Sequence, residues 1–328
     1  MTITPDRSYD GMSMSESGIR ALAASNERLN IRLTNDFAFK TTFHNKVALT
    51  GLLSALLEID PREIRDLEFK DTTLTSEYPN EKQGILDVKL LMNGDRKINI
   101  EIQVLPYAYW EERSLFYLSK HFVEGFERGS SYKMLETTIH INILAFPLFE
   151  DGSWYFIIEL RDRKTHRLYS DKMSLHVLQL NQLSRATPEE HESEVYAWAQ
   201  MISSKDWEVL KRMAERNEYM KAAVDELEKI NSEEEMRYHY LMREKQEHDE
   251  ATIRLYEREL GIEQGILHGK TEAVLELLED IGKVPDSLRQ TVSEQHDLQI
   301  LKNWHKLAAK SDSIEDFERR MNQTVVSE

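Results

Sequence analysis

Two acidic residues, Asp87 and Glu101, are the side chains of this chain best placed to do chemistry. They belong to residues 84–103, a stretch that reads as two strands joined by a tight turn, with one carboxylate on each strand. Gln103 follows Glu101 by two positions, so the acid and the amide share one face of the second strand. Two acids and an amide that converge at one end of a sheet predict a divalent-metal site.

The register of this hairpin decides whether the two acids meet. Asn93-Gly94 is a strong hairpin signal, because both residues tolerate positive φ. A loop of residues 93–95 pairs Met92 with Arg96 and places Asp87 opposite Glu101, whereas a shorter loop offsets the acids by one residue. The apolar face of the second strand consists of Ile98, Ile100 and Ile102, and its polar face of Lys97, Asn99, Glu101 and Gln103.

The elements around the hairpin predict an α/β fold. Thr34-Asn35-Asp36 can cap a buried helical region that runs up to Pro61. A helix over 110–126 is expected to bury Leu115, Phe116, Leu118, Phe122 and Phe126 and to carry Arg113, Lys120 and Glu124 on the opposite face. The expected strands are 64–74, 85–92, 97–103, 137–149, 154–160 and 166–180.

The second half of the chain reads as helical. Short helices are expected over 195–202 and 206–214, followed by a long charged stretch over 219–260. Gly261, Gly265 and Gly269 then recur at every fourth residue, which indicates either a flexible or kinked junction or a close contact between two helices. We divide the chain into a loose tail (1–26), an α/β domain (27–180), a helical region with the glycine stripe (181–282) and a small helical module (283–328).

Composition excludes several classes of protein. The 328 residues contain no cysteine, so disulfides, thiolate catalysis and Cys-ligated zinc are ruled out. The net charge of −17 gives no support to nucleic-acid binding, but most of the excess acid lies in residues 181–328. We find no membrane-spanning run, signal peptide, zinc-type histidine spacing, phosphate-binding loop or Gly-x-Ser-x-Gly elbow, and we expect a cytoplasmic protein.

An ordered set of short motifs resembles the recombination-promoting nuclease family, also called PD-(D/E)XK nuclease family transposases. The likeness covers about residues 31–278, and the set as a whole is more specific than any one motif. Its members are Leu33-Thr34-Asn35-Asp36-Phe37-Ala38-Phe39-Lys40, Leu86-Asp87-Val88-Lys89, Ile100-Glu101-Ile102-Gln103, Tyr109 and Arg113 before Tyr117, Gly129, Tyr132 and the strand Ile139–Ile143.

The resemblance implies a restriction-endonuclease-like core, a mixed sheet flanked by helices, followed here by an all-helical C-terminal region. It implies metal-dependent cleavage of DNA with a role in recombination or transposition, and it places the two catalytic carboxylates at Asp87 and Glu101. The lysine that is usual in the superfamily is replaced by Gln103, which can orient a water or a phosphate oxygen but adds no charge. Asp87, Glu101 and the main-chain carbonyl of Ile102 are then expected to hold Mg²⁺, with Mn²⁺ as a second candidate.

Plainer explanations remain open for each of these residues. Asp87 and Glu101 can be ordinary solvated residues on a strand face. Asp36 can approach the metal or cap its helix, and Arg113 and Lys120 can contact phosphates or lie on a solvated face. Tyr109 can stack near DNA or pack at the rim. For the whole chain, the alternative function is a catalytically weak or inactive nuclease fold that binds DNA or protein, with self-association through the helical half.

Overall fold

The computed structural model describes residues 14–74 and 84–325 and divides the chain into two compact units, Met1–Glu247 and His248–Glu328. Residues 1–13, the first part of the predicted tail, lie outside the described residues. Residues 16–23, which we also expected in that tail, instead form helix α1 (Glu16–Ala23). Ser15 caps α1, and Ile19 and Ala23 are buried on its apolar side. The cap and this burial stabilise the short helix.

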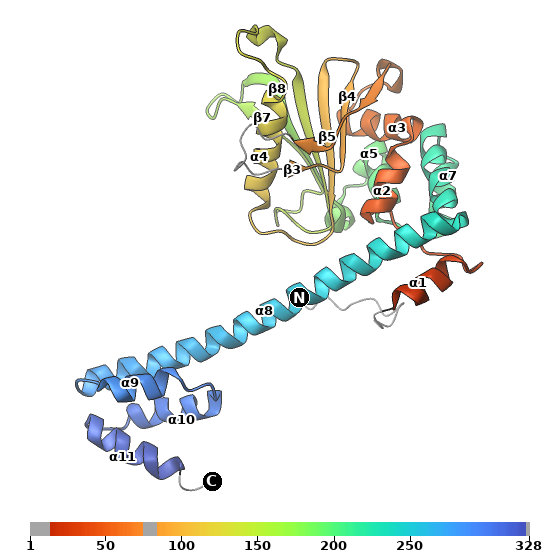
Figure 1. Cartoon of the computed structure of the whole chain (residues 1–328). Helices are drawn as coiled ribbons and strands as arrows, with labels where there is room; N and C mark the ends of the chain where they lie inside the picture. The colour runs from red at the N-terminus through yellow and green to blue at the C-terminus, as the bar shows by residue number, and fades with distance from the viewer. Residues whose placement is uncertain (1–13, 75–83, 326–328) are drawn as a thin grey trace. The chain divides into compact units, whose positions relative to one another are not determined.

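The first unit is built on a six-stranded mixed sheet with the strand order β1-β4-β5-β6-β8-β7 (Figure 1). Strands β5, β6 and β8 are parallel neighbours, and the remaining pairs are antiparallel. The strands are β1 (Leu67–Phe69), β4 (Val88–Met92), β5 (Arg96–Gln103), β6 (Thr137–Leu144), β7 (Tyr155–Arg161) and β8 (Leu168–Gln179). This mixed sheet, with helices on both faces, confirms the predicted fold class.

Helices from both halves of the chain cover one face of the sheet (Figure 1). The helices on this side of the sheet are α2 (Asp36–Phe43), α3 (Lys46–Leu57) and α5 (Glu194–Ser203). Helices α6 (Trp207–Ala214) and α7 (Glu218–Ser232) pack against these helices. The isoleucine side chains of β5 point to this face and share one core with α2, α3 and α7, because apolar residues at every second position of a strand line a single face. The short 3₁₀ segments are Pro61–Glu63, Tyr132–Met134, Leu180–Arg185 and Glu190–Glu192.

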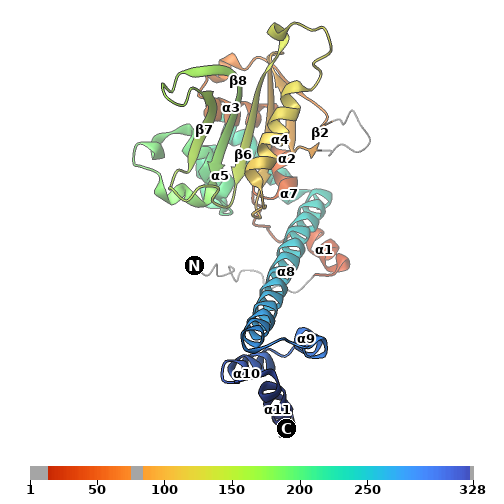
Figure 2. The same ribbon diagram turned by 90° about the vertical axis from the view of Figure 1, so that its left-hand side faces the viewer.

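Helix α4 (Trp110–Val123) covers the opposite face, as Figure 2 shows. Tyr117, Leu118 and His121 are buried there, while Leu115 and Phe116, which we expected to be buried, are exposed. The predicted apolar face of this helix is therefore wrong at two positions. The reason is that α4 packs on the polar face of β5 and β6, so polar and aromatic side chains turn inward.

The hairpin follows the predicted register, with Met92 paired to Arg96 and Val88 to Ile100. Its first strand begins at Val88 and not at Ile85, because Gly84–Ile85 forms β3 and pairs with β2 (Thr73–Leu74) in a separate small sheet. The strand expected over 64–74 is likewise split into β1 and β2. Asp87 therefore lies in a break between β3 and β4, next to the strand that carries Glu101.

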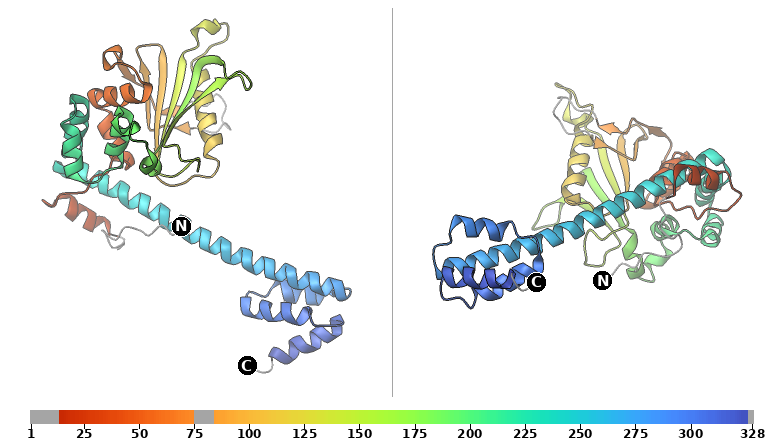
Figure 3. Two further views of the ribbon diagram at one scale, coloured as in Figure 1. Left: turned by 180° about the vertical axis from the view of Figure 1, so that it is seen from behind. Right: turned by 60° about the horizontal axis from the view of Figure 1, so that its bottom comes forward.

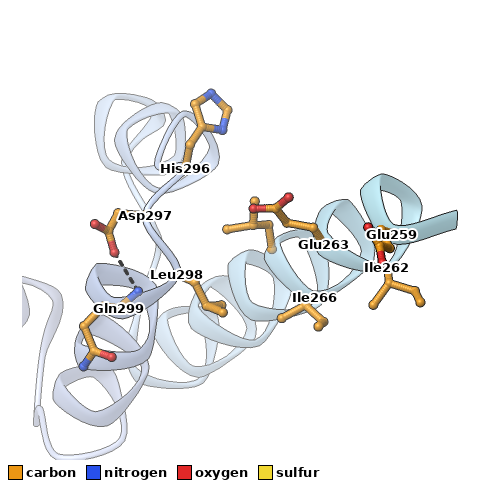
Figure 4. A pocket seen from close by; sticks show the side chains of 9 residues that line it. Glu259, Ile262, Glu263, Ile266, His296, Asp297, Leu298 and Gln299 are labelled. Atoms are coloured by element: carbon orange, nitrogen blue, oxygen red, sulfur yellow. Dashed lines mark hydrogen bonds between the residues drawn. The ribbon is translucent and has the colours of Figure 1, made fainter. Parts of the chain in front are cut away.

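The second unit is helical. It contains the later part of α8 (Glu234–Ile281), followed by α9 (Asp286–Ser293), α10 (Leu298–Ala308) and α11 (Ile314–Val325), which pack together as Figure 3 shows. Its own core includes Val274, Leu278, Leu301, Trp304 and Phe317. A cavity of about 520 Å³ lies between α8 and the start of α10, with Ile262, Ile266 and Leu298 among its lining residues (Figure 4).

The glycine stripe lies within α8, which continues through it without interruption. A Cβ added at Gly261, Gly265 or Gly269 would meet no neighbouring atom within 4 Å. Among the described residues, the glycines therefore make neither a break in the helix nor a close helix contact. No helix in the described ranges is both long and apolar enough to cross a membrane. The division of the chain at residues 26, 180 and 282 remains a prediction.

Candidate metal centre

Asp87 is held in place by the strand next to it. Its Oδ2 accepts a hydrogen bond from the backbone N–H of Ile102 at 2.9 Å, and its Oδ1 lies 3.1 Å from the Nζ of Lys40 on α2. The side chain is 18% exposed, and burial raises the pKa of the carboxyl, with Lys40 opposing that shift. Because the N–H and C=O of one residue in a strand point to the same edge, the Ile102 carbonyl lies on the Asp87 side of β5.

Glu101 is buried on β5, with only 3% of its surface exposed. The alternative, that Glu101 is an ordinary solvated residue on a strand face, is therefore excluded. Its Oε1 accepts a hydrogen bond from the Arg113 guanidinium at 2.9 Å, and its Oε2 has no hydrogen-bond partner among the described residues. Burial raises the pKa of Glu101 to about 7, with the negative charge of Asp87 adding to the shift and Arg113 only partly offsetting it.

His140 on β6 lies beside the free oxygen of Glu101, with its Nε2 at 3.6 Å from Oε2. Burial lowers the pKa of His140 to about 4, so the ring is neutral at physiological pH. The amide nitrogen of Asn99 lies 2.7 Å from Nδ1 and is only a donor, so Nδ1 accepts and the ring proton is on Nε2. A neutral N–H donor therefore faces the carboxylate without completing a hydrogen bond.

Arg113 is fixed against Glu101 by aromatic rings. Its guanidinium lies over the rings of Tyr107, Trp110 and Tyr117 at 4.8, 5.3 and 5.1 Å from their centroids. This side chain is therefore not a solvated face charge. It instead orients the buried carboxylate of Glu101.

Asp36 does not cap α2, because Asn35 is the cap and its side chain accepts from the Ala38 N–H. The Asp36 carboxylate instead lies 2.7 Å from Lys40 Nζ through Oδ1 and 3.3 Å from the Arg243 guanidinium of α8 through Oδ2. Lys40 therefore joins Asp36 to Asp87. The structure brings Asp36 close to the site through this lysine.

The other predicted site residues, Gln103, Tyr109 and Lys120, make no contact with the two carboxylates among the interactions that the structure gives for them. The Gln103 side chain donates from Nε2 to the Leu105 carbonyl at 3.0 Å, so its amide is engaged in a local turn. Tyr109 precedes α4 with a positive φ of 61°, and the residue is 78% exposed. Lys120, two turns beyond Arg113, lies 5.7 Å from the centre of the Phe116 ring.

The donor set suits a hard divalent cation. Carboxylate and carbonyl oxygens are the ligands that Mg²⁺ prefers, and Mg²⁺ keeps several waters while binding to one or two carboxylates. The orphaned Oε2 and the raised pKa of Glu101 both identify a place where a cation would stabilise buried negative charge. In the described ranges no cluster of three or more His, Cys, Asp or Glu is arranged to hold a metal, so the fit rests on two carboxylates and one carbonyl.

Three residues of this site were not among our predictions: Lys40, Arg243 and His140. The sequence could have indicated Lys40, because Asp36 precedes it by four residues and side chains four apart on a helix are neighbours. The sequence could not have indicated Arg243, since it reaches Asp36 from a helix far along the chain. His140 appeared only as one member of an apolar strand.

A comparison with known protein families identifies the family of this chain. The family model for PD-(D/E)XK nuclease family transposases matches residues 33–256, more than half of the 328 residues. The match includes Asp36, Asp87, Glu101 and Arg113, and it confirms the resemblance drawn from the sequence motifs. No curated protein and no solved structure matches the chain. The chain belongs to the PD-(D/E)XK nuclease family transposases.

Proposed function

We propose that this protein is a metal-dependent DNA endonuclease associated with transposition or recombination. Asp87, Glu101 and the Ile102 carbonyl are its proposed ligands for Mg²⁺ or Mn²⁺. The observation that carries this proposal is the buried carboxylate of Glu101, which has one unpartnered oxygen and lies close enough to Asp87 for the two charges to interact. Membership of a nuclease family supports the same activity.

Groups of the protein orient the two carboxylates that would hold the cation. The bound cation would make an attacking water more acidic and stabilise the negative charge on the phosphate. The Ile102 N–H fixes the orientation of Asp87, and Arg113 fixes that of Glu101. Since both carboxylates are held by groups with restricted motion, little reorganisation is needed when the ligand binds.

The roles of the accessory residues Tyr109, Lys120 and Gln103 remain proposals. Tyr109 presents an exposed ring at the start of α4 and is our candidate for stacking on DNA. Lys120 remains our candidate for a phosphate contact. Gln103 is proposed as a water or phosphate orienter, which requires it to release the Leu105 carbonyl. Self-association through the helical half remains a prediction.

One observation favours a second function. Asp87 and Glu101 are each already paired with a cationic side chain, Lys40 and Arg113, and position 103 carries no charge. A nuclease fold whose carboxylates are neutralised by its own side chains can serve as a DNA-binding or protein-binding module without cleavage. The two functions differ in one property, which is metal binding that depends on Asp87.

A plasmid-nicking assay tests the proposal. We expect the wild type to convert supercoiled plasmid to nicked or linear product in Mg²⁺ or Mn²⁺, and Asp87→Ala to abolish this activity because it removes one of two carboxylate ligands. Asp95→Ala is the matched control, since Asp95 is an exposed acid in the turn of the same hairpin. It should cleave at the wild-type rate.

Thermal unfolding with added metal separates the two functions. A ligand that binds only the folded protein stabilises it, by about 2.7 kcal/mol at a hundredfold excess over Kd. The endonuclease predicts stabilisation by Mg²⁺ or Mn²⁺ that Asp87→Ala removes. Equal cleavage by wild type and Asp87→Ala, or no cleavage and no metal stabilisation in either, would reject it in favour of a binding module.

A further inference from the structure

Lys40 occupies a central position at the candidate site. It lies on α2, one helical turn after Asp36, and its ammonium contacts carboxylates from two separate elements. The Nζ–Oδ1 distances are 2.7 Å to Asp36 and 3.1 Å to Asp87. The side chain is 40% exposed, so the ammonium lies at the border between the buried carboxylates and solvent.

Gln103 and Arg113, the nearby side chains that we expected to assist the reaction, are already engaged by other groups. The amide of Gln103 carries no charge and is bonded to the Leu105 carbonyl. The Arg113 guanidinium is bonded to Glu101 and lies among aromatic rings. A lysine, by contrast, carries three donors on a flexible stem. Lys40 forms ion pairs with two carboxylates, and its three donors allow the same ammonium to donate to a ligand as well.

We propose that Lys40 is the catalytic cation of this site and donates from Nζ to a non-bridging oxygen of the scissile phosphate. This inference rests on the proposed nuclease function. In the hydrolysis, water forms the new P–O bond while the P–O bond to the leaving oxygen breaks. The proton that water loses balances the one that the leaving oxygen gains. Lys40 keeps its own proton and stabilises the charge that develops on the phosphate oxygens.

The position of Lys40 fits this role better than a purely structural one. A helix-stabilising ion pair with Asp36 would need only the contact within α2. The lysine also reaches Asp87, which belongs to the sheet and is the proposed metal ligand. Asp36 and Asp87 hold the ammonium from two sides, so the charge is fixed beside the place where the metal and phosphate are proposed to meet.

The test compares Lys40→Met and Lys40→Arg with wild type. Lys40→Met should lower the single-turnover nicking rate on the order of 100-fold, the usual loss when one donor to a developing oxyanion is removed. Lys40→Arg, which keeps the charge, should recover part of that loss. Lys46→Met is the matched control: Lys46 is 59% exposed and pairs with Asp66, away from the site. It should nick at the wild-type rate.

Binding measurements separate catalysis from structure. Calorimetric titration with Ca²⁺, which reports metal binding without turnover, should give Lys40→Met an affinity equal to or higher than wild type, because one positive charge has been removed next to Asp87. Its unfolding midpoint should match that of Lys46→Met. A wild-type nicking rate in Lys40→Met would overturn the proposal, and so would a rate loss that follows loss of Ca²⁺ binding or of folded protein.

Failure of the nuclease function gives a different result. In that case the wild type itself forms no nicked product, and the Lys40 proposal is rejected together with the function on which it rests. Failure of the Lys40 proposal alone leaves wild type and Lys40→Met equally active, while Asp87→Ala is inactive.

Discussion

Two opposing effects act on the charge of the Glu101 carboxyl. Its ion pair with Arg113 at 2.9 Å favours the charged carboxylate, while burial favours the neutral acid. Burial dominates and raises the pKa from 4.5 to about 7. The unfolded carboxyl therefore loses its proton at lower pH than the folded one, so the free energy of unfolding falls as the pH rises between these two values.

This sign leads to a prediction for Glu101→Gln in the absence of metal. The variant cannot ionise, so its free energy of unfolding should exceed that of the wild type by an amount that grows from about pH 5 to about pH 8. Its upper limit is about 3 kcal/mol, from the size of the pKa shift. Urea denaturation at a series of pH values measures the difference.

The difference in unfolding free energy between Glu101→Gln and wild type cancels the contributions of the other titrating groups. The buried side chains of His121, His140 and His176 have lowered pKa values and make stability fall toward acid pH, but they are present in both proteins. Glu112→Gln, an exposed acid on α4, should show no pH-dependent gain. A difference between Glu101→Gln and wild type that does not change with pH would contradict the predicted cost of charge at Glu101.

Residue spacing predicted the two carboxylates but not their partners. Asp87 and Glu101 could be found because hairpin register and strand alternation are local rules. The role of Arg113 as the partner of Glu101 could not be found, since it depends on which face of α4 meets the sheet. The engagement of Gln103 with Leu105 is a rotamer choice that a sequence pattern does not determine.

At the scale of elements, α3 makes a contact that depends on a missing side chain. A Cβ at Gly51 would lie 2.3 Å from the Tyr219 Cβ on α7 and 2.8 Å from the Trp198 ring on α5. The Tyr219 Cβ is rigidly attached to the backbone, so relief requires α7 itself to shift. Gly51 therefore allows the close approach of helices from the two halves of the chain.

Gly51→Ala should destabilise the protein. An alanine normally stabilises a helix interior by about 1 kcal/mol relative to glycine, but overpacking in a core costs about 1–3 kcal/mol or more. With a contact this close we expect overpacking to win, with a net loss of about 2 kcal/mol. Val47→Ala changes an exposed position of the same helix and should stay near wild type in the same urea titration. Unchanged or increased stability of Gly51→Ala would show that α7 is not fixed against α3.

Strands and helices could be predicted where the local sequence pattern determines the structure. They could not be predicted where pairing with another strand or packing on the sheet determines it. The hairpin turn follows from Asn93-Gly94 and the inward face of its second strand from the isoleucine alternation, whereas the sequence left two registers open and the structure has the one with Met92 paired to Arg96. The break at Asp87 does not follow from a local pattern, because it arises when Gly84–Ile85 pairs with β2 instead of extending β4. The inward face of α4 was predicted wrongly because it packs on a polar row of the sheet, which reverses the usual rule that apolar side chains are buried.

At the scale of the whole chain, the two largest cores among the described residues lie in different units. The main core joins residues from Leu29 to Tyr240, so helices of the second half complete the packing of the sheet. The other core lies entirely in the second unit and runs from Val274 to Met321. All the groups of the candidate metal centre belong to the first unit. Stability of the two units can therefore be perturbed separately.

Calorimetric unfolding should resolve two transitions, because each unit has its own core and two-state behaviour holds for single units. Mg²⁺ or Mn²⁺ should raise only the transition of the first unit, since ligand binding stabilises only the unit whose folded form binds it. Leu301→Ala removes a fully buried side chain from the second core and should cost that unit about 2–5 kcal/mol, with the metal-sensitive transition unchanged. A single transition that both the metal and Leu301→Ala displace would mean that the two cores unfold as one cooperative unit.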